Sequence, residues 1–427
     1  FAPGQIAPGT YTAPITASIT DGYGNTKSAS ESVDVDTVVM NLASNGVTDP
    51  DGIVNGMDAA DGITLTGTVE PGSTVSVRLG LVTHSATVAA NGTWTVDFAA
   101  GEVPGGEQDV PVLVTATDGA GNSAIVTDTV TVDTSVNQLA LGLSVGGDGY
   151  INAQEAAMGL TLTGVVEAGS SVIVNFDGTS RAASVDAQGN WSVGFAPSEI
   201  GTGDEQVNVT ISATDAAGNT ATVTETAHLD TEAPDAPHVT GYYRSGDDLD
   251  GITVYTGDAT AEITTLAADG AQGQVQTISR ENFLNPLDQI DFGFPQDLPN
   301  GQHLLITKSD DAGNTSSTLF ALDAGLPDAI NLDQPGFMNK EIEAIDLRFA
   351  ENSELTMDSG LLESLSRNSN ALTIHGSADD AVMIDTTDGA TLSDTNQNVT
   401  IGTETYSVYT LGDEGGMLII DDDITIT

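Results

Sequence analysis

Short stretches in which apolar and polar residues alternate follow one another along most of the chain. Between residues 134 and 230 they include LALGLSV, GLTLTGVV, SSVIVNF, NWSVGF, QVNVTISATD and TATVTETAHLD. Alternation with a period of two is typical of β-strands with one buried face. Clusters of Gly, Asp and Asn, which favour turns, separate the stretches. The pattern therefore predicts an all-β chain of short strands and many turns.

The strand pattern repeats. A Thr/Ser-Asp-x-x-Gly-Asn element occurs four times, and successive copies lie 97, 97 and 95 residues apart. Trp94 recurs at the same step as Trp191. About seven strands in a repeat of this length are typical of an antiparallel β-sandwich of the immunoglobulin type. The aspartates of the four elements are Asp21, Asp118, Asp215 and Asp310, and the acids that close successive repeats are Asp36, Asp133 and Asp230.

The predicted fold is therefore a set of tandem immunoglobulin-like β-sandwich domains in an extended array, followed by a mostly β C-terminal domain. We expect the Trp and Phe of each repeat to fill its core. In the last part, MDSGLLESLSRN predicts one helix with Asp358 or Ser359 as N-cap, and the strands fit either a sandwich or a small β-roll. The predicted parts are a partial Ig-like domain at 1–36, Ig-like domains at 37–133 and 134–230, a diverged Ig-like domain at 231–325, and the C-terminal domain at 326–427.

Composition narrows the choice of partners. The chain has 62 Asp and Glu against 9 Lys and Arg, which gives a net charge of −53, and it has no cysteine. Nucleic acid and anionic membrane surfaces require basic residues, so neither is an expected partner, whereas cations are. No apolar run is long enough to insert into a membrane. The chain opens with Phe-Ala-Pro-Gly, without an initiator Met or a signal peptide, so we expect a fragment or a processed piece.

Acids of the repeat are predicted to meet at the domain junctions. In such a sandwich, the turn after the second strand and the turn before the last strand face the end of the preceding domain. The first turn carries a glutamate, the second is the Asp-x-x-Gly-Asn element, and the preceding domain ends in an aspartate. Ca²⁺ suits such a cluster because it accepts six to eight oxygens, whereas Mg²⁺ demands a strict octahedron. The predicted ligands are Asp36, Glu70, Asp118 and Asn122, then Asp133, Glu167, Asp215 and Asn219, then Asp230 and Asp310 in the diverged domain, which has no glutamate turn.

A second set of acids recurs between the first two strands of each complete repeat. An acid, an amide and an acid keep the same spacing in DGIVNGMDA and DGYINAQEA. This arrangement predicts a loop wrapped around one cation. The two triplets are Asp51, Asn55 and Asp58, and Asp148, Asn152 and Glu155.

Less specific interpretations compete with these metal sites. Asp-x-x-Gly-Asn is also a common turn, in which Asp and Asn bond their own backbone and Gly supplies a positive φ. The acidic surface of a halophilic protein would explain the composition too, but it predicts acids spread over strand faces. His303 and His375 lie in alternating apolar contexts that indicate structural histidines, and the acids at 421–423 are interpreted as a solvated turn.

The repeat resembles the bacterial Ig-like domains of large RTX-type surface adhesins, which type I secretion exports. The residues that carry the resemblance are the glutamate turns VEPGS and VEAGS, the TDxxGN turns and the terminal VDT, over residues 1–230 and more weakly over 231–325. The resemblance implies a secreted, cell-surface stalk whose junctions Ca²⁺ makes rigid. The chain has no RTX nonapeptide run, so the resemblance places any secretion signal outside it.

No enzyme is expected, because the chain has no HExxH, GxSxG or Walker A motif and its five histidines are scattered. The expected function is that of a calcium-stiffened stalk or adhesive region of a bacterial cell-surface adhesin, in cell adhesion or biofilm formation. Two alternatives stay open: a self-assembling surface-layer or filament subunit, and a tip module that binds a glycan or a protein. The expected partners are neighbouring Ig-like domains of the same parent chain, an unidentified host, cell-surface or matrix ligand, and copies of the chain itself.

Overall fold

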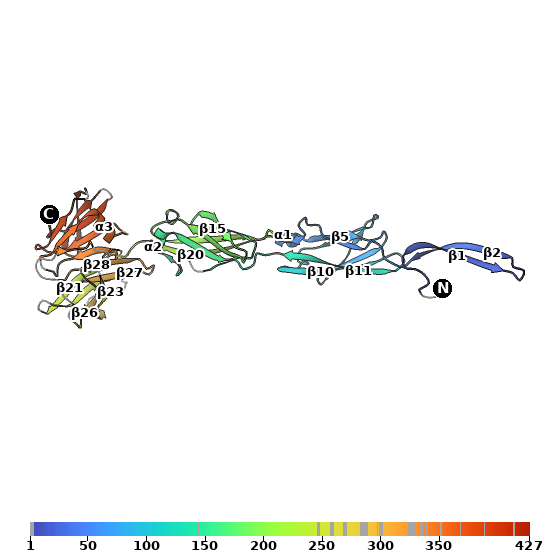
Figure 1. Cartoon of the computed structure of the whole chain (residues 1–427), viewed down its shortest axis with the longest axis horizontal. Coiled ribbons are helices and arrows are strands. Elements are labelled where there is room, and N and C mark those ends of the chain that lie inside the picture. The colour runs from blue at the N-terminus through green and yellow to red at the C-terminus, as the bar shows by residue number, and fades with distance from the viewer. Residues whose placement is uncertain are drawn as a thin grey trace. The chain divides into compact units, whose positions relative to one another are not determined.

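The structure is a computed structural model of the 427-residue chain (Figure 1). Strands make up 56% of the residues that the structure describes and helices 6%, which confirms the predicted all-β class. No described helix is both long and apolar enough to cross a membrane. The structure describes residues 4–142, 145–245, 248–256, 260–267, 271–281, 289–296, 298, 302–322, 329–333, 336–338, 340–350, 352–367, 369–387, 389–412 and 415–427.

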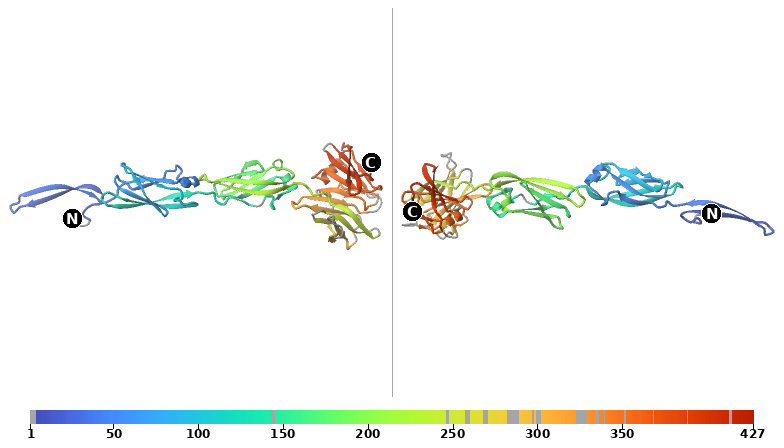
Figure 2. Two further views of the ribbon diagram at one scale, coloured as in Figure 1. Left: turned by 180° about the vertical axis from the view of Figure 1, so that it is seen from behind. Right: turned by 90° about the horizontal axis from the view of Figure 1, so that it is seen from above.

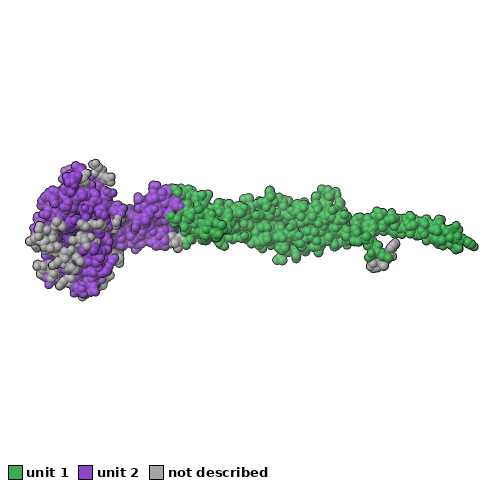
Figure 3. Space-filling model, viewed as in Figure 1, with its two compact units in different colours: residues 1–143, 161–193, 208–225 green, residues 144–160, 194–207, 226–427 purple. Residues whose placement is uncertain are grey.

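The chain divides into two compact units, coloured green and purple in Figure 3. The first unit comprises residues 1–143, 161–193 and 208–225. The second comprises residues 144–160, 194–207 and 226–427.

The first unit begins with a hairpin. Strands β1 (Thr10–Thr20) and β2 (Thr26–Asp36) pair antiparallel over their whole length and form a two-stranded sheet. They lie side by side in both views of Figure 2. The Asp21 carboxylate stabilises the turn between them, because its Oδ1 accepts hydrogen bonds from the N–H groups of Tyr23 and Asn25 at 2.9 Å each.

A two-sheet sandwich follows the hairpin. One sheet has the strand order β3-β5-β9-β8 and the other has β4-β11-β10-β6-β7. In β9 the buried Trp94, Val96 and Phe98 alternate with exposed residues, so the predicted aromatic core of this repeat is confirmed. The strands are β3 (Ala43–Val47), β4 (Ile53–Val54), β5 (Ile63–Thr68), β6 (Thr74–Leu79), β7 (Val82–Ser85), β8 (Thr87–Val88), β9 (Thr93–Phe98), β10 (Glu107–Thr117) and β11 (Ser123–Asp133).

The next repeat has the same strand order in both sheets, β12-β14-β18-β17 and β13-β20-β19-β15-β16. Trp191 and Phe195 are buried at the positions that correspond to Trp94 and Phe98. A short 3₁₀-helix (Pro197–Glu199) precedes β19. The strands are β12 (Ala140–Leu141), β13 (Tyr150–Ile151), β14 (Leu160–Val165), β15 (Ser171–Phe176), β16 (Thr179–Ala182), β17 (Ser184–Val185), β18 (Asn190–Phe195), β19 (Asp204–Thr214) and β20 (Thr220–Asp230).

Each of these two repeats also contains a six-residue helix that is not among the elements predicted from the sequence. These helices are α1 (Gly56–Asp61) and α2 (Ala153–Met158). Each follows a two-residue strand, β4 or β13, that pairs in parallel with the last strand of its own repeat, β11 or β20. The pairing places the start of each helix beside the end of that last strand.

The second unit contains a further pair of sheets. One has the order β21-β22-β26-β25, and the other is the β24-β23-β27-β28 part of a nine-stranded sheet. Apolar side chains of both sheets, such as Ile252 and Leu304, share one buried cluster. The strands are β21 (His238–Ser245), β22 (Asp248–Tyr255), β23 (Thr260–Ala267), β24 (Gln272–Gln274), β25 (Ile278–Glu281), β26 (Gln289–Gly293), β27 (Gln302–Ser309) and β28 (Thr315–Phe320).

The C-terminal strands form a small β-roll, which is one of the two topologies left open by the sequence. Successive strands alternate between the nine-stranded sheet and a sheet of order β29-β31-β33-β37. Within each sheet the strands of the roll run parallel, apart from the antiparallel excursion of β34 and β35. The strands are β29 (Ala329–Ile330), β30 (Ile342–Asp346), β31 (Glu354–Met357), β32 (Ala371–His375), β33 (Ala381–Ile384), β34 (Leu392–Ile401), β35 (Glu404–Leu411), β36 (Gly416–Asp421) and β37 (Thr425–Ile426).

The predicted helix is confirmed as α3 (Ser359–Leu365). Asp358 is its N-cap, and the Asp358 Oδ1 accepts a hydrogen bond from the Leu361 N–H at 2.7 Å. The acids at 421–423 differ from expectation in one respect, because Asp421 is buried rather than solvated.

The nine-stranded sheet runs across the predicted domain boundary at 325/326. Strand β28 of the diverged repeat pairs in parallel with β30 of the roll, and Thr318 lies opposite Ala344. One buried cluster contains Leu305 and Leu319 together with Ile345. The physical reason is that β28 would otherwise be an edge strand with unpaired backbone groups, which β30 satisfies. The domain limits themselves stay predictions, but these two parts share one sheet and one core.

Candidate metal centre

Three carboxylates of the first unit gather where one sandwich ends and the next begins. Asp133 closes β11, Glu167 lies in the turn between β14 and β15, and Asp215 begins the turn between β19 and β20. Each offers one oxygen, and these oxygens all lie within 4.8 Å of one another. Asp215 is buried, and the other two residues are half-buried. Among the described residues, no other group of three His, Asp or Glu side chains meets this distance.

The Asp-x-x-Gly-Asn turn holds Asp215 in place. Its Oδ1 accepts a hydrogen bond from the Asn219 N–H at 2.8 Å, and its Oδ2 accepts one from the Asn219 Nδ2 at 2.8 Å. Gly218 has a φ of 88°, in the left-handed region that favours glycine. These are the bonds of a common turn. The Asn219 Nδ2 also donates to the main-chain oxygen of Asp133 at 2.9 Å, a bond that an isolated turn does not need.

The linker between the two sandwiches orients Glu167. The Asn137 N–H donates to the Glu167 Oε2 at 2.9 Å, and the Glu167 N–H donates to the Asn137 carbonyl at 3.0 Å. Ser170, in the same turn, is only 6% exposed, and its Oγ has no hydrogen-bond partner. The turn therefore presents one oriented carboxylate and one buried hydroxyl oxygen that is free to bind.

Glu107 is a fourth acid near the cluster, and it is not among the ligands predicted from the sequence. It begins β10 opposite Asp133, and its Oε2 accepts a hydrogen bond from the Asn137 Nδ2 at 3.0 Å. The corresponding residue one repeat later is also an acid, Asp204. This recurrence was the available signal, because the hairpin turn fixes which residue lies opposite the strand-closing acid.

The cluster is electrostatically strained. Burial raises the pKa of Asp133, and repulsion from Asp215 and Glu107 adds to the effect. Burial also raises the pKa of Glu167, again with repulsion from the neighbouring acids. None of the ion pairs between described residues includes these acids. When folding raises the pKa of a carboxyl group, the folded protein becomes less stable as the pH rises from the ordinary pKa of the group through the raised one. At neutral pH the ionised cluster therefore opposes folding.

The donor set fits a hard divalent cation. It consists of oxygens alone, from Asp133, Glu167 and Asp215, with the unpartnered Ser170 hydroxyl on the same turn as Glu167. Ca²⁺ takes six to eight oxygen ligands in flexible geometry and completes its shell with water, whereas Zn²⁺ and copper favour nitrogen or sulfur. The residues present therefore suit Ca²⁺.

The corresponding acids one repeat earlier do not gather in the same way. The Asp36 Oδ1 accepts a hydrogen bond from the Thr10 hydroxyl at 2.9 Å. The Glu70 Oε1 is buried and has no partner. The pKa of Asp118 is lowered. Burial alone would raise it, but the hydrogen bonds that the carboxylate accepts from Asn122 and from the turn backbone have the larger effect. A metal role for Asp36, Glu70, Asp118 and Asn122 stays a prediction.

In the second unit, Asp230 and Asp310 lie on either side of one asparagine. The Asn314 Nδ2 donates to the Asp230 carbonyl and to the Asp310 Oδ2, each at 2.9 Å. Burial raises the pKa of Asp230, and repulsion from Asp310 and Asp204 adds to it. The third acid, Asp204, instead pairs with His228 at 2.6 Å. This pair of acids has no glutamate turn to complete it, as the sequence indicates.

The triplets between the first two strands are built into helix caps. The Asn55 Oδ1 accepts from the Asp58 N–H, and the Asp58 Oδ2 accepts from the Asn55 N–H, each at 3.0 Å. Asn152 and Glu155 form the same reciprocal capping box. The first acid of each triplet also bonds a nearby N–H group: Asp51 that of Ile53, and Asp148 that of Tyr150. Oxygens expected to bind a cation thus bond the backbone, and a cation at these loops stays a prediction.

Comparison with known proteins gives one family match. A family model described as a bacterial Ig domain matches residues 49–133. None of the curated proteins compared matches the chain.

Solved structures of bacterial adhesins show partial likeness. One, from a study of host cell surface retention of a 1.5-MDa bacterial ice-binding adhesin, is 24% identical, and the match covers 66% of this chain and 96% of that chain at a TM-score of 0.36. A second, described as a Ca²⁺-stabilized adhesin that helps an Antarctic bacterium bind ice, is 24% identical over 72% of this chain and 80% of that chain, at a TM-score of 0.30. A third, a bacterial immunoglobulin-like domain of the M. primoryensis ice-binding adhesin, is 29% identical over 23% of this chain and 97% of that chain, at a TM-score of 0.19.

The matched segment contains β4 to β11 of the first complete sandwich, including the glutamate turn and the TDGAGN turn on which the resemblance was based. Residues 49–133 are therefore a bacterial Ig domain.

Proposed function

We propose that this chain is a calcium-binding region of a bacterial cell-surface adhesin, in which Ca²⁺ stiffens the junctions between consecutive Ig-like sandwiches. The observation that carries the proposal is the meeting of Asp133, Glu167 and Asp215, which form no ion pair with any basic side chain that the structure describes. The bacterial Ig domain at residues 49–133 supports the bacterial setting. The excess of acids over bases supports a cation as the ligand.

The proposed stiffening follows from where the ligands come from. Asp133 belongs to the last strand of one sandwich, whereas Glu167 and Asp215 belong to two turns of the next. A bound Ca²⁺ would supply the positive charge that relieves the repulsion between them. The linker residue Asn137 keeps the Glu167 carboxylate pointed at the junction, and the turn keeps Asp215 beside it. Rotation of one sandwich against the other would then require a ligand to leave.

The proposed location is outside the bacterial cell, on its surface. The absence of cysteine suits export without oxidative folding. The large net negative charge that remains after any cation has bound would keep neighbouring chains apart. Export by type I secretion and a role in adhesion or biofilm formation belong to the same proposal and rest on the resemblance of the repeats.

Removal of calcium should lower the thermal stability of the chain. A ligand that binds only the folded state adds stability that grows with its free concentration, about 2.7 kcal/mol at 100 times its dissociation constant. We expect the first melting transition to rise with Ca²⁺ and to fall again with excess chelator. The Glu167→Gln variant should respond less, because it lacks one ligand of the cluster.

The matched control is Glu225→Gln, which removes the same charge from an exposed position in the middle of β20. It should respond to Ca²⁺ as the unmodified chain does. Identical melting with Ca²⁺ and with chelator would refute the proposal. Light scattering on the same samples tests the assembly alternative, which predicts a Ca²⁺-dependent rise in mass instead of a constant monomer mass.

A further inference from the structure

Asn219 makes more hydrogen bonds than its turn requires. Its Nδ2 donates to the Asp133 carbonyl at 2.9 Å and to the Asp215 Oδ2 at 2.8 Å. Its Oδ1 accepts a hydrogen bond from the Gly56 N–H at 2.7 Å. Asn219 is 8% exposed. One buried side chain of the second sandwich thus bonds both the end of the last strand and the start of a helix in the first sandwich.

Strand pairing explains why these two groups lie together. Strand β4 pairs in parallel with the end of β11, with Val54 opposite Val132, so α1 begins beside Asp133. The first N–H groups of a helix have no partner within the helix. Asn55 caps the N–H groups of Met57 and Asp58, and the Gly56 N–H is left for Asn219. The first sandwich therefore presents one acceptor and one donor, which match the two ends of a carboxamide.

The contact leaves little free space. A Cβ added to Gly56 would lie 2.9 Å from the Thr134 carbonyl oxygen and 3.1 Å from the Asn219 Oδ1. Even one methyl group at residue 56 would thus have to displace the linker or the asparagine. The helix start, the linker and the turn form one packed joint.

The same contact recurs in the second unit, one repeat later. The Ala153 N–H, at the start of α2, donates to the Asn314 Oδ1 at 2.8 Å. The Asn314 Nδ2 donates to the Asp230 carbonyl, and the Asn152 Nδ2 donates to the Ala312 carbonyl at 3.1 Å. Among the described residues, Asn122 in the equivalent turn of the first sandwich bonds only within its own turn, where its Nδ2 donates to the Asp118 Oδ2 at 2.7 Å. Two of the four turns therefore dock onto a neighbouring helix, and the turn that contains Asn122 provides a comparison.

We propose that Asn219 and Asn314 are latches that dock each sandwich onto the one before it without a metal ion. The two shortest bonds that Asn219 makes across the joint, to the Asp133 carbonyl and from the Gly56 N–H, join neutral amide groups, so they do not depend on the cation proposed above. The Asn219 Nδ2 also bonds the Asp215 carboxylate and lies 3.3 Å from the Asp133 Oδ1, so the latch positions two acids of the cluster before any ion arrives. Calcium would then strengthen a joint that already exists.

Hydrogen exchange of the full chain in excess chelator tests the latch. In the unmodified chain, the peptide that contains the Gly56 N–H should be protected. Asn219→Ala should make this N–H exchange roughly 2- to 10-fold faster, as expected for the loss of one hydrogen bond. Asn122→Ala should leave the exchange at Gly56 unchanged, although it removes the same intra-turn bonds. Tryptophan fluorescence verifies that each variant is folded.

Gly56→Ala provides a second route, should Asn219→Ala not fold. It disturbs the joint from the helix side and leaves the turn at 215–219 intact, so faster exchange at residue 56 alone supports the latch. If the Gly56 N–H is unprotected in the chelated chain, or is equally protected in the Asn219→Ala variant, the latch is refuted. If the Gly56 N–H is protected in a chain that binds no Ca²⁺, the calcium proposal is refuted and the latch is supported. If the chain binds Ca²⁺ but the Gly56 N–H is not protected in excess chelator, the latch is refuted and the calcium proposal is supported.

Discussion

Replacement of Arg348 by alanine is expected to destabilise the C-terminal part of the chain by about 3–5 kcal/mol, because it leaves a buried charge without a partner. The partner is Asp346, the last residue of β30, whose side chain is 1% exposed. The Arg348 Nε donates a hydrogen bond to the Asp346 Oδ1 at 2.9 Å, and the Arg348 Nη2 donates one to the Asp346 Oδ2 at 2.5 Å. Arg348 also donates to the Val239 carbonyl of β21 at 2.6 Å.

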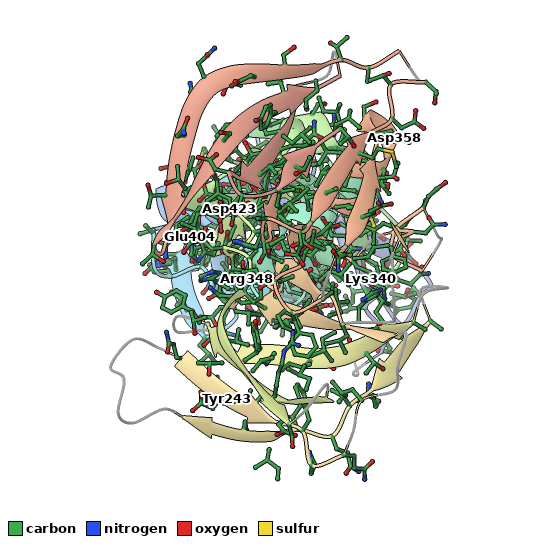
Figure 4. The ribbon with its side chains drawn as sticks, turned by 90° about the vertical axis from the view of Figure 1, so that its left-hand side faces the viewer. Tyr243, Lys340, Arg348, Asp358, Glu404 and Asp423 are labelled. Carbon is green, nitrogen blue, oxygen red and sulfur yellow. The ribbon has the colours of Figure 1, made fainter. Side chains whose placement is uncertain are left out.

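Arg348 therefore joins the roll to the diverged sandwich, and Figure 4 shows it where the strands of the two parts meet. Two histidines, His238 and His375, lie near this ion pair, and burial lowers the pKa of each in the unmodified chain. His375 lies opposite Asp346 in the parallel ladder, but burial lowers the pKa of His375 to about 4 and keeps the ring neutral. The balance of charge at Asp346 thus rests on Arg348.

Denaturant unfolding followed by circular dichroism measures this loss. Both tryptophans, Trp94 and Trp191, lie in the first unit, so their fluorescence transition should not move in the Arg348→Ala chain. Arg78→Ala, on an exposed position of β6, is the control and should change stability by no more than about 0.5 kcal/mol. A combined replacement of Asp346 by Leu and Arg348 by Met should cost less than Arg348→Ala, because it removes both charges. Equal stability of the Arg348→Ala and Arg78→Ala chains would contradict the expectation.

Replacement of Trp94 by alanine should destabilise the first sandwich by about 3–5 kcal/mol, as is usual for loss of a buried large aromatic side chain. Trp94 is 0% exposed, and its Nε1 donates to the carbonyls of Ala43 and Thr68 at 3.2 Å each. The ring packs on Gly67 so closely that a Cβ there would lie 2.3 Å from it. The sandwich cannot close over the gap without moving two strands.

Calorimetry of the Trp94→Ala chain should show the transition of this sandwich at lower temperature. The remaining Trp191 reports the next sandwich, whose own unfolding should shift far less. Leu81→Ala is the control, because Leu81 is 97% exposed and its loss should be nearly neutral. The expectation fails if the transitions of the Trp94→Ala and Leu81→Ala chains coincide.

Local pattern and the repeat were sufficient to predict the sandwiches. Alternation marks both faces of a strand, so the burial of Trp94 and Trp191 follows from their position among apolar neighbours. The direction of the strands then indicates which turns lie at the same end of a sandwich. The structure brings Asp133, Glu167 and Asp215 together at that end. A metal ion at that place is a separate step and remains the proposal.

The helices α1 and α2 were missed because one pattern has two physical interpretations. An amide followed three residues later by an acid can supply cation ligands, but it is also the signature of a capping box. Asn55 and Asp58 do form a capping box, since each side chain bonds the backbone of the other, and a cation at this loop stays a prediction. The short Ala-containing runs that follow, GMDAAD and AQEAAM, were the available sign of a helix.

The roll could not be deduced from the sequence for a different reason. Parallel strands such as β30, β32 and β36 are joined by long connections, so local pattern does not show which strands become neighbours. The same limit hid the sheet shared by β28 and β30. Pairing of this kind depends on contacts that are distant in the chain.

Calorimetric titration of the metal-free chain with Ca²⁺ tests the central proposal most directly. We expect the unmodified chain and the Glu225→Gln chain to bind the same number of Ca²⁺ ions. We expect the Glu167→Gln chain to lose one of these sites or to bind Ca²⁺ more weakly there. An unmodified chain that binds no Ca²⁺, or a Glu167→Gln chain that binds the same number with the same affinity, would contradict the proposal.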